Sequence, residues 1–239
     1  MTKLDSSRAM FFPKALLFDL DGTLIDSEAA ICDSASAAFL TLGRKVDSAD
    51  IADHLGAPLI ELFQLFYLEQ DPAPGGEELL KDPVFQDYLK AYIHEHDLHP
   101  ESEGLPLPGV LSGLEALETI ALPKAVATTK PTHRAEPHIQ NGPLKRFFKH
   151  VQGTNVGMKP KPKPDVLFAA CAALDVDVTE TWMIGDTQRD VSAAIATGAW
   201  SVAIAYSDER YAQAEEFGAD IVIRSIGELV ELLLTARDK

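Results

Sequence analysis

The sequence predicts an α/β protein with a doubly wound parallel sheet and an all-helical segment inserted after its first strand. From residue 109 onward, short apolar runs alternate with helix-length segments, which is typical of a parallel sheet. Residues 26 to 99 carry only helical patterns. Hydrophobic residues make up 46% of the 239 residues, enough for a sizeable core.

The first predicted strand is the apolar run Ala15–Phe18, and it ends at two acids, Asp19 and Asp21. Side chains two apart in an extended chain point the same way, so both carboxylates can lean over one spot. Crowded carboxylates repel each other unless a cation or a shared proton holds them, and a hard divalent cation suits such oxygen ligands. Taken alone, Asp21-Gly22 could equally be a turn after a strand.

Apolar residues at helical spacing predict the helices of the inserted segment. The first helix closes at Gly43, and prolines and glycines mark loops. The predicted elements are a helix over 31–42, the helices Leu59–Leu68 and Pro83–His96, a loop over 71–76 and a linker over 100–108. We therefore expect residues 1–25 and 104–239 to form the α/β core and residues 26–103 a helical domain.

The rest of the chain alternates between strands and helices. The predicted strands are Ala125–Thr128, His150–Gly153 (a strand or a loop), Thr181–Gly185, Ser201–Ala205 and Asp220–Ile223. The predicted helices lie at 111–117, Thr132–Gln140, Asp165–Leu174, 191–198 and 226–234. In such folds, ligands bind beyond the carboxyl ends of the strands.

Polar side chains follow these strands at the edge where a ligand would bind. Thr128 and Thr129 follow the second strand, a lysine-rich loop spans 157–165, and Asp186 ends a later strand with Asp190 one helical turn further on. This set suits phosphoryl transfer. One carboxylate can act as nucleophile and another as acid and base, while a cation and a lysine spread the charge of the transferred group.

Four motifs appear in one order along most of the chain, and together they resemble the haloacid dehalogenase superfamily in its phosphatase branch. They are Asp19-x-Asp21-Gly-Thr-Leu, Thr128 after an apolar strand, Lys161-Pro-x-Pro-Asp, and Gly185-Asp186-x-x-x-Asp190. The chain is most similar to phosphoglycolate phosphatase-like enzymes. The resemblance implies a Rossmann-like core of the haloacid dehalogenase type with a helical cap inserted after the first motif.

The resemblance also implies a Mg²⁺ site formed by Asp19, Asp21, Asp186 and Asp190. Asp19 would be both nucleophile and ligand, and Asp21 would be the general acid and base and offer its backbone carbonyl to the metal. Asp186 would be a ligand, and Asp190 would support either the water shell of the metal or Lys161. An acid at position 21 resembles phosphatases and mutases, because a halide leaves without a proton.

The same resemblance assigns phosphate binding to Thr128, with a weaker contribution from Thr129, and to Lys161. Three lysines precede prolines in this loop, and the family pattern selects Lys161 because Pro164-Asp165 follows at the right offset. We expect Lys159 and Lys163 to be solvated.

The predicted function is a Mg²⁺-dependent phosphatase acting through a phosphoaspartate on a small phosphomonoester of the phosphoglycolate, sugar phosphate or nucleotide type. The alternatives are a phosphomutase of the β-phosphoglucomutase type and a non-catalytic phosphate-binding module. Many relatives carry an arginine shortly after the cap loop that 55–58 resembles, where this chain has Glu61. The nearby candidates for binding a second anionic group are His54 and, less favourably, Arg44 or Lys45.

Charge and composition exclude other classes of partner. The net charge of -16 disfavours nucleic acid and anionic membranes, which require basic stripes. The two cysteines, Cys32 and Cys171, lie in apolar helical patterns and are expected to be core residues in a reducing compartment. We expect a soluble, cytoplasmic monomer or small homo-oligomer. His94, His96 and His99 are expected on the surface, because their spacing does not suit a zinc site.

Overall fold

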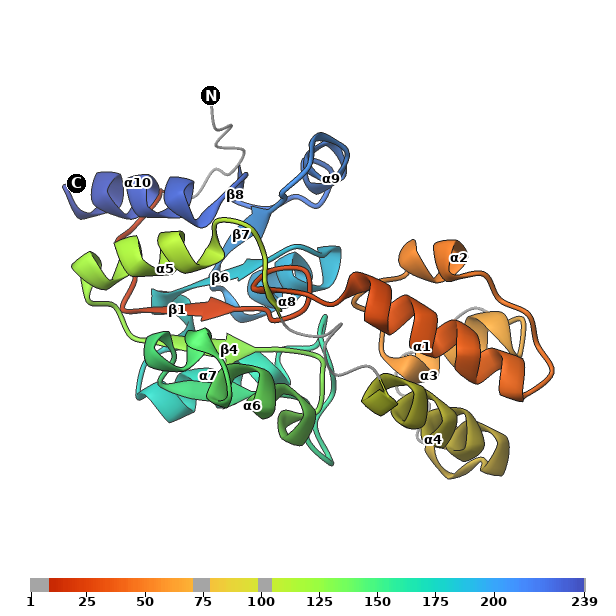
Figure 1. The fold of residues 1–239 in the computed structure, drawn as a ribbon. Coiled ribbons are helices and arrows are strands. Elements are labelled where there is room, and N and C mark those ends of the chain that lie inside the picture. The colour runs from red at the N-terminus through yellow and green to blue at the C-terminus, as the bar shows by residue number, and fades with distance from the viewer. Residues whose placement is uncertain (1–8, 71–77, 99–104, 239) are drawn as a thin grey trace. The chain divides into compact units, whose positions relative to one another are not determined.

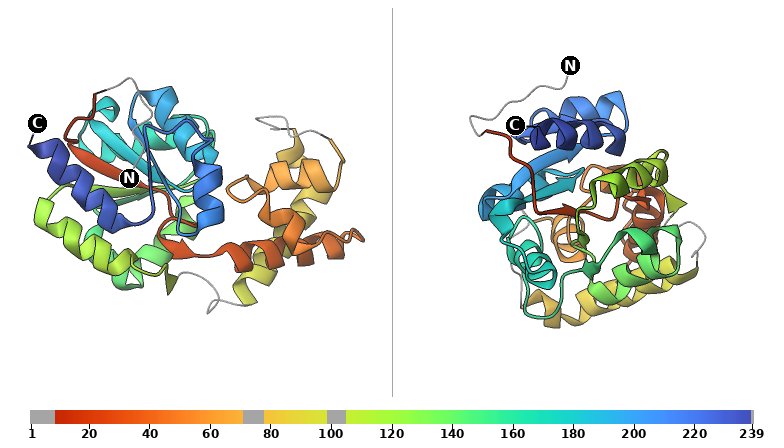
Figure 2. Two further views of the ribbon diagram at one scale, coloured as in Figure 1. Left: turned by 90° about the horizontal axis from the view of Figure 1, so that it is seen from above. Right: turned by 90° about the vertical axis from the view of Figure 1, so that its left-hand side faces the viewer.

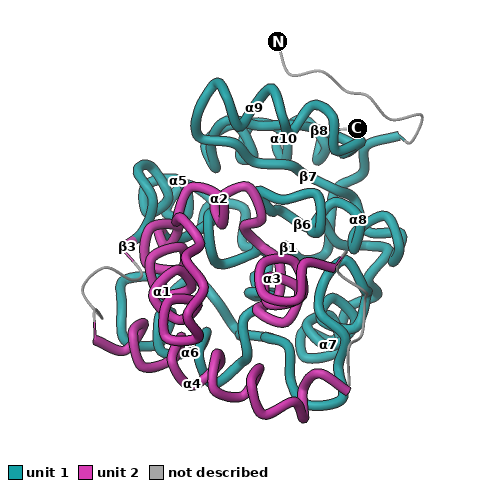
Figure 3. The backbone as a smooth tube through the Cα atoms, turned by 90° about the vertical axis from the view of Figure 1, so that its right-hand side faces the viewer, with its two compact units in different colours: residues 1–25, 106–239 teal, residues 26–105 magenta. Residues whose placement is uncertain are grey.

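A computed structural model describes residues 9–70, 78–98 and 105–238. The chain folds as two compact units, coloured separately in Figure 3: Met1–Ile25 with Pro106–Lys239, and Asp26–Leu105. The expected second boundary, between 103 and 104, lies outside the described residues, as do His99 and the loop expected over 71–76. Within the described ranges, no helix is both long and apolar enough to span a membrane.

The first unit contains a six-stranded parallel sheet with the order β5-β4-β1-β6-β7-β8, which confirms the predicted fold class (Figure 1). Chain order and spatial order differ because helical crossovers join the parallel strands. The strands are β1 (Ala15–Phe18), β4 (Lys124–Ala127), β5 (His150–Gln152), β6 (Thr181–Gly185), β7 (Trp200–Ile204) and β8 (Ile221–Ile223).

Helices cover both faces of this sheet, as the views in Figure 2 show. Alternate residues of β1 face opposite sides, so Leu16 and Phe18 belong to the core under α5, α6 and α10. Leu17 belongs to the core under α7 and α8, and α9 packs with α8 near β7 and β8. The helices are α5 (Val110–Leu117), α6 (Thr132–Gln140), α7 (Asp165–Leu174), α8 (Gln188–Thr197), α9 (Asp208–Ala214) and α10 (Ile226–Arg237). Short 3₁₀ turns, η3 (Glu118–Ile120), η4 (Pro143–Phe147) and η5 (Val178–Glu180), occupy the connections.

The second unit is helical, with an aromatic core. Phe39 and Tyr88 lie 4.5 Å apart between ring centroids, and Phe63 and Phe85 lie 5.3 Å apart. Its elements are α1 (Glu28–Thr41), α2 (Ser48–Ala52), α3 (Leu59–Phe66), the 3₁₀ turn η1 (Leu79–Lys81) and α4 (Pro83–Leu98). Two short strands, β2 (Ile25–Asp26) and β3 (Leu105–Pro106), pair where the chain passes between the units.

Most predicted elements of the core are confirmed, and the differences are small. Strand β4 ends at Ala127, so Thr128 lies just beyond the strand and its side chain is available to the loop. Helices α2 and α9 were not predicted, because they are short and each buries a single apolar side chain. Helix α2 has five residues and helix α9 has seven. Cys32 and Cys171 are both buried and form no disulfide, as expected.

The expectation of surface histidines is wrong for His96, whose residue is only 2% exposed. His96 follows Tyr88 and Tyr92 at four-residue intervals, so it shares their buried face of α4. Its ring lies 5.2 Å from that of Tyr92. His94 is exposed.

Candidate active site at the carboxyl edge of the sheet

The register of three neighbouring strands brings the first motif, Thr128 and Asp186 to one edge of the sheet. Phe18 of β1 pairs with Val126 of β4 on one side and with Ile184 of β6 on the other. The Asp19 amide then donates to the Ile184 carbonyl at 2.8 Å, so the chain stays aligned one residue beyond the strand.

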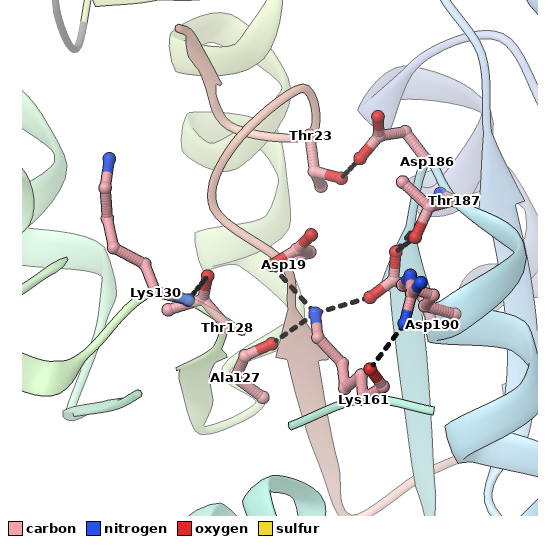
Figure 4. A network of polar contacts seen from close by, with 10 residues as sticks. Asp19, Thr23, Ala127, Thr128, Lys130, Lys161, Asp186, Thr187 and Asp190 are labelled. Atoms are coloured by element: carbon pink, nitrogen blue, oxygen red, sulfur yellow. Dashed lines mark hydrogen bonds and ion pairs between the residues drawn. The ribbon is translucent and has the colours of Figure 1, made fainter. Parts of the chain in front are cut away.

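Lys161 reaches this edge from the loop between β5 and α7, and its side chain is only 1% exposed. Its Nζ lies 2.8 Å from Asp19 Oδ1 in an ion pair, and it donates to Asp190 Oδ1 and, at 2.9 Å, to the Ala127 carbonyl (Figure 4). The Lys161 ammonium has three protons, and three oxygens surround it. Lys159 and Lys163 are exposed, which agrees with the sequence prediction.

Asp190 uses both of its carboxylate oxygens for local contacts. While Oδ1 accepts from Lys161, Oδ2 accepts from the Thr187 amide at 3.1 Å and the Thr187 hydroxyl at 2.6 Å. The contacts with Thr187 form a capping box that begins α8. A Cβ at Gly185 would lie 2.2 Å from Asp190 Cγ, so this close approach requires glycine. The structure thus brings Asp190 to Lys161.

Asp186 is held by the loop that carries the first motif. Its Oδ1 accepts a hydrogen bond of 2.8 Å from the Thr23 hydroxyl (Figure 4). Gly22 adopts a φ of 77°, and a Cβ there would lie 2.3 Å from Asp186 Oδ2. The Tyr206 hydroxyl donates to the Thr23 carbonyl at 2.7 Å. Burial, with a contribution from Asp186, raises the pKa of Tyr206, which keeps this hydroxyl protonated as a donor.

Three carboxylates form a group that could hold a metal ion. One oxygen each of Asp19, Asp186 and Asp190 lies within 4.8 Å of the others. Burial and the Asp190 charge raise the pKa of Asp19 to about 7, although Lys161 opposes this shift. Burial and the two neighbouring aspartates also raise the pKa of Asp186. These shifts mark crowded negative charge, which a divalent cation would relieve. The residues therefore fit a cation.

Burial alone would lower the pKa of Lys161, but Asp19 and Asp190 outweigh it and raise this pKa above its ordinary value. Lys161 therefore remains a cation inside the site. A buried cation between two carboxylates is suited to screen a bound anion.

The Asp21 side chain is not part of this metal group and instead pairs with Lys130. Their Nζ and Oδ1 atoms lie 3.0 Å apart, with side chains 10% and 21% exposed. The expected metal contact of Asp21 used its backbone carbonyl and does not depend on this side chain.

Thr128 is buried directly after β4, and its amide donates to the Gln152 carbonyl of β5 at 2.9 Å. Its hydroxyl accepts from the Lys130 amide at 3.2 Å and so shapes the turn that follows. Thr129, the next residue, is half-buried in that turn. Both threonines therefore lie at the expected edge of the sheet.

Sequence reasoning did not assign site contacts to Thr23, Lys130 or Tyr206. Lys130 carried a usable signal, because it stands three residues beyond a strand that ends at the same edge. Thr23 lies inside the first motif, and its hydroxyl was available as a donor. Tyr206 carried only its position two residues after β7.

Two of the three candidate residues for binding a second anion form ion pairs inside the helical unit. Arg44 donates to the Tyr67 carbonyl and pairs with Glu69 at 2.7 Å. Lys45 lies 3.6 Å from Asp47. The His54 ring contacts Phe66, with the centroids 5.5 Å apart.

Comparisons with known proteins agree with this fold. A family model described as haloacid dehalogenase-like hydrolase matches residues 16–204. A protein of Chromobacterium violaceum named phosphoglycolate phosphatase is 30% identical over 92% of this chain and 96% of its own length. A crystal structure from Clostridium acetobutylicum, titled a predicted phosphatase, is 25% identical, covers 94% of this chain and 99% of its own, and has a TM-score of 0.72.

A haloacid dehalogenase-like hydrolase from Streptococcus pneumoniae shares the fold, with a TM-score of 0.74 at 24% identity over 92% of this chain and 97% of its own. The family match covers most of the chain and includes the first motif, Lys161 and the Asp186 segment. The chain belongs to the haloacid dehalogenase-like hydrolase family.

Proposed function

We propose that the protein is a Mg²⁺-dependent phosphatase that hydrolyses a small phosphomonoester through a phosphoaspartate at Asp19. The observation that carries this proposal is the buried Lys161 between Asp19 and Asp190, with Asp186 alongside. The relative from Chromobacterium violaceum named phosphoglycolate phosphatase supports a substrate of this class. Residues 26–105 would form the cap that selects the leaving group.

In the proposed first half-reaction, an Asp19 carboxylate oxygen attacks phosphorus and the bond to the leaving-group oxygen breaks. Asp21 gives its proton to that oxygen, so the product leaves as an alcohol. Lys161 and Thr128 hold the phosphoryl oxygens, with Thr129 beside them. A Mg²⁺ ion bound by Asp19, Asp186 and the Asp21 carbonyl would spread the negative charge of the phosphoryl group.

In the second half-reaction, the Asp21 carboxylate takes a proton from water, whose oxygen attacks phosphorus. The bond between Asp19 and phosphorus breaks, inorganic phosphate is released, and the Asp19 carboxylate is restored. Asp190 contributes by holding Lys161 rather than by touching the phosphate, because both of its oxygens already accept hydrogen bonds. Lys130 keeps the Asp21 side chain at the same edge of the sheet.

A phosphate-release assay over a panel of phosphoglycolate, sugar phosphates and nucleoside monophosphates tests the proposal, with Mg²⁺ or with a chelator. We expect release only with the cation and a clear preference within the panel. Isomerised sugar phosphate without released phosphate would indicate a mutase. Phosphate binding without turnover would indicate a binding module. Either of these results would overturn the proposal.

We expect Mg²⁺ to raise the melting temperature more at about pH 8 than at about pH 5. In the cation-free protein, the folded state keeps a proton on Asp19 up to about pH 7, against an ordinary pKa of 3.8. The free energy of unfolding of the cation-free protein should therefore fall as pH rises from 3.8 to about 7, because the unfolded chain releases the Asp19 proton at a lower pH than the folded chain does. At low pH, Mg²⁺ must displace the proton on Asp19 in order to bind, whereas at high pH Asp19 is already ionised.

Thermal unfolding followed by circular dichroism measures both trends, and Na⁺ at equal ionic strength is the control for screening. An equal Mg²⁺-dependent shift at the two pH values would contradict the assignment of the cation to these carboxylates.

A further inference from the structure

Asp186 is oriented by the loop that carries the first motif. The Thr23 side chain is fully buried, and its hydroxyl donates to Asp186 Oδ1 across 163 residues of sequence. The other oxygen, Oδ2, faces the Cα of Gly22 so closely that a Cβ there would lie 2.3 Å away. A hydrogen bond on one side and a backbone contact on the other leave this carboxylate little freedom to rotate.

The position of this loop is secured from a third strand. The Tyr206 hydroxyl donates to the Thr23 carbonyl at 2.7 Å, across 183 residues of sequence. Tyr206 itself follows Ala205, whose amide donates to the Ile223 carbonyl, and precedes Ser207, whose hydroxyl caps α9. The tyrosine therefore projects from a short segment that is anchored at both ends.

We propose that Thr23 and Tyr206 are positioning residues that set the orientation of Asp186 for Mg²⁺. This inference rests on the proposed function. Thr23 acts on the carboxylate directly, and Tyr206 acts through the Thr23 backbone. Groups that hydrogen-bond to a metal-ligating carboxylate fix its orientation, and their loss typically weakens metal binding by about 10- to 100-fold.

Calorimetric titration of the substrate-free protein with Mg²⁺ tests the proposal without using activity. We expect Thr23→Val, which keeps the shape and removes the hydroxyl, to weaken Mg²⁺ binding by about 10- to 100-fold. Thr23→Ser restores the hydroxyl and should remain within about threefold of the wild type. Tyr206→Phe should weaken binding by roughly three- to tenfold, because it loosens the loop and leaves the Thr23 hydroxyl in place.

Two matched variants control for general loss of packing. Thr197→Val removes a buried hydroxyl that donates to the carbonyls of Ala193 and Ala194 in α8 and accepts from the Ala199 amide. Tyr211→Phe removes a tyrosine hydroxyl five residues beyond Tyr206, on a ring that stacks with Arg224. Both should bind Mg²⁺ like the wild type.

Wild-type Mg²⁺ affinity in Thr23→Val would overturn the inference alone. A loss in Thr23→Ser as large as that in Thr23→Val would also overturn it, because packing rather than the hydroxyl would then be responsible. If Thr23→Val does not fold, unchanged Mg²⁺ binding in Tyr206→Phe overturns the inference, because the tyrosine holds the Thr23 backbone that carries the hydroxyl. A wild-type protein that binds no Mg²⁺ would overturn the proposed cation site together with this inference.

Discussion

Asp19→Asn should lower phosphatase activity by at least about 10⁴-fold, the loss typical when a covalent nucleophile is removed. The amide cannot form the acyl phosphate, although it has nearly the same shape as the carboxylate. Phosphate release under saturating Mg²⁺ measures this loss. Because the change removes one of the three crowded carboxylates, Mg²⁺ should also stabilise the variant less than the wild type.

The stability of the same variant separates lost chemistry from lost folding. The pKa of Asp19 is raised to about 7, so its ionised form costs the folded state free energy at about pH 8. Asparagine avoids this cost, and we expect the cation-free variant to melt no lower than the wild type at that pH. Asp208→Asn, which changes an exposed acid paired with Arg224, is the matched control and should keep full activity. Activity within tenfold of the wild type would remove Asp19 from the nucleophilic role.

The sequence was informative where local patterns and strand ends coincide. The apolar run Ala15–Phe18 stops at Asp19, and the run that ends at Gly185 stops at Asp186, so the sequence alone places both acids at the carboxyl edge of the sheet. Parallel strands impose this convergence whatever their order in the sheet. The choice of Lys161 over its two neighbours came from the family resemblance, and the structure shows it buried against Asp19.

The contacts that were missed depend on strand order, which alternation of strands and helices does not reveal. Tyr206 reaches the Thr23 backbone because β7 lies beside β6 and β6 beside β1. Lys130 reaches Asp21 because β4 lies on the other side of β1. Both pairs join segments more than 100 residues apart, so no local pattern identifies the two partners of either pair.

The burial of His96 was readable from the sequence and was overlooked. Tyr88, Tyr92 and His96 recur every four residues, which places them on one face of a helix. The spacing of the histidines alone does not reveal this face. A helical stripe that includes the tyrosines would have predicted an aromatic, buried environment for His96.

Lys161→Met should lower activity by about 10³-fold and also destabilise the fold, because it leaves Asp19 and Asp190 facing each other without a cation. Removing one partner of a buried ion pair typically lowers the free energy of unfolding by about 3–5 kcal/mol. The loss in the free energy of unfolding should grow as pH rises from about 5 to about 8. At the lower pH, Asp19 can carry a proton because its pKa is raised to about 7, and at the higher pH its charge remains unopposed. Chemical denaturation at both pH values measures this dependence.

The same loop supplies two matched controls, since Lys159 and Lys163 also precede prolines but are exposed. Lys159→Met and Lys163→Met should leave both activity and stability near wild-type values, because exposed lysines contribute little to either. The double variant Asp19→Asn/Lys161→Met should be more stable than Lys161→Met alone, because one of the two opposed carboxylates is gone. A double variant less stable than Lys161→Met would mean that Lys161 stabilises the site through packing rather than charge. Such a result would weaken its assignment as the cation that screens the charge of the phosphoryl group.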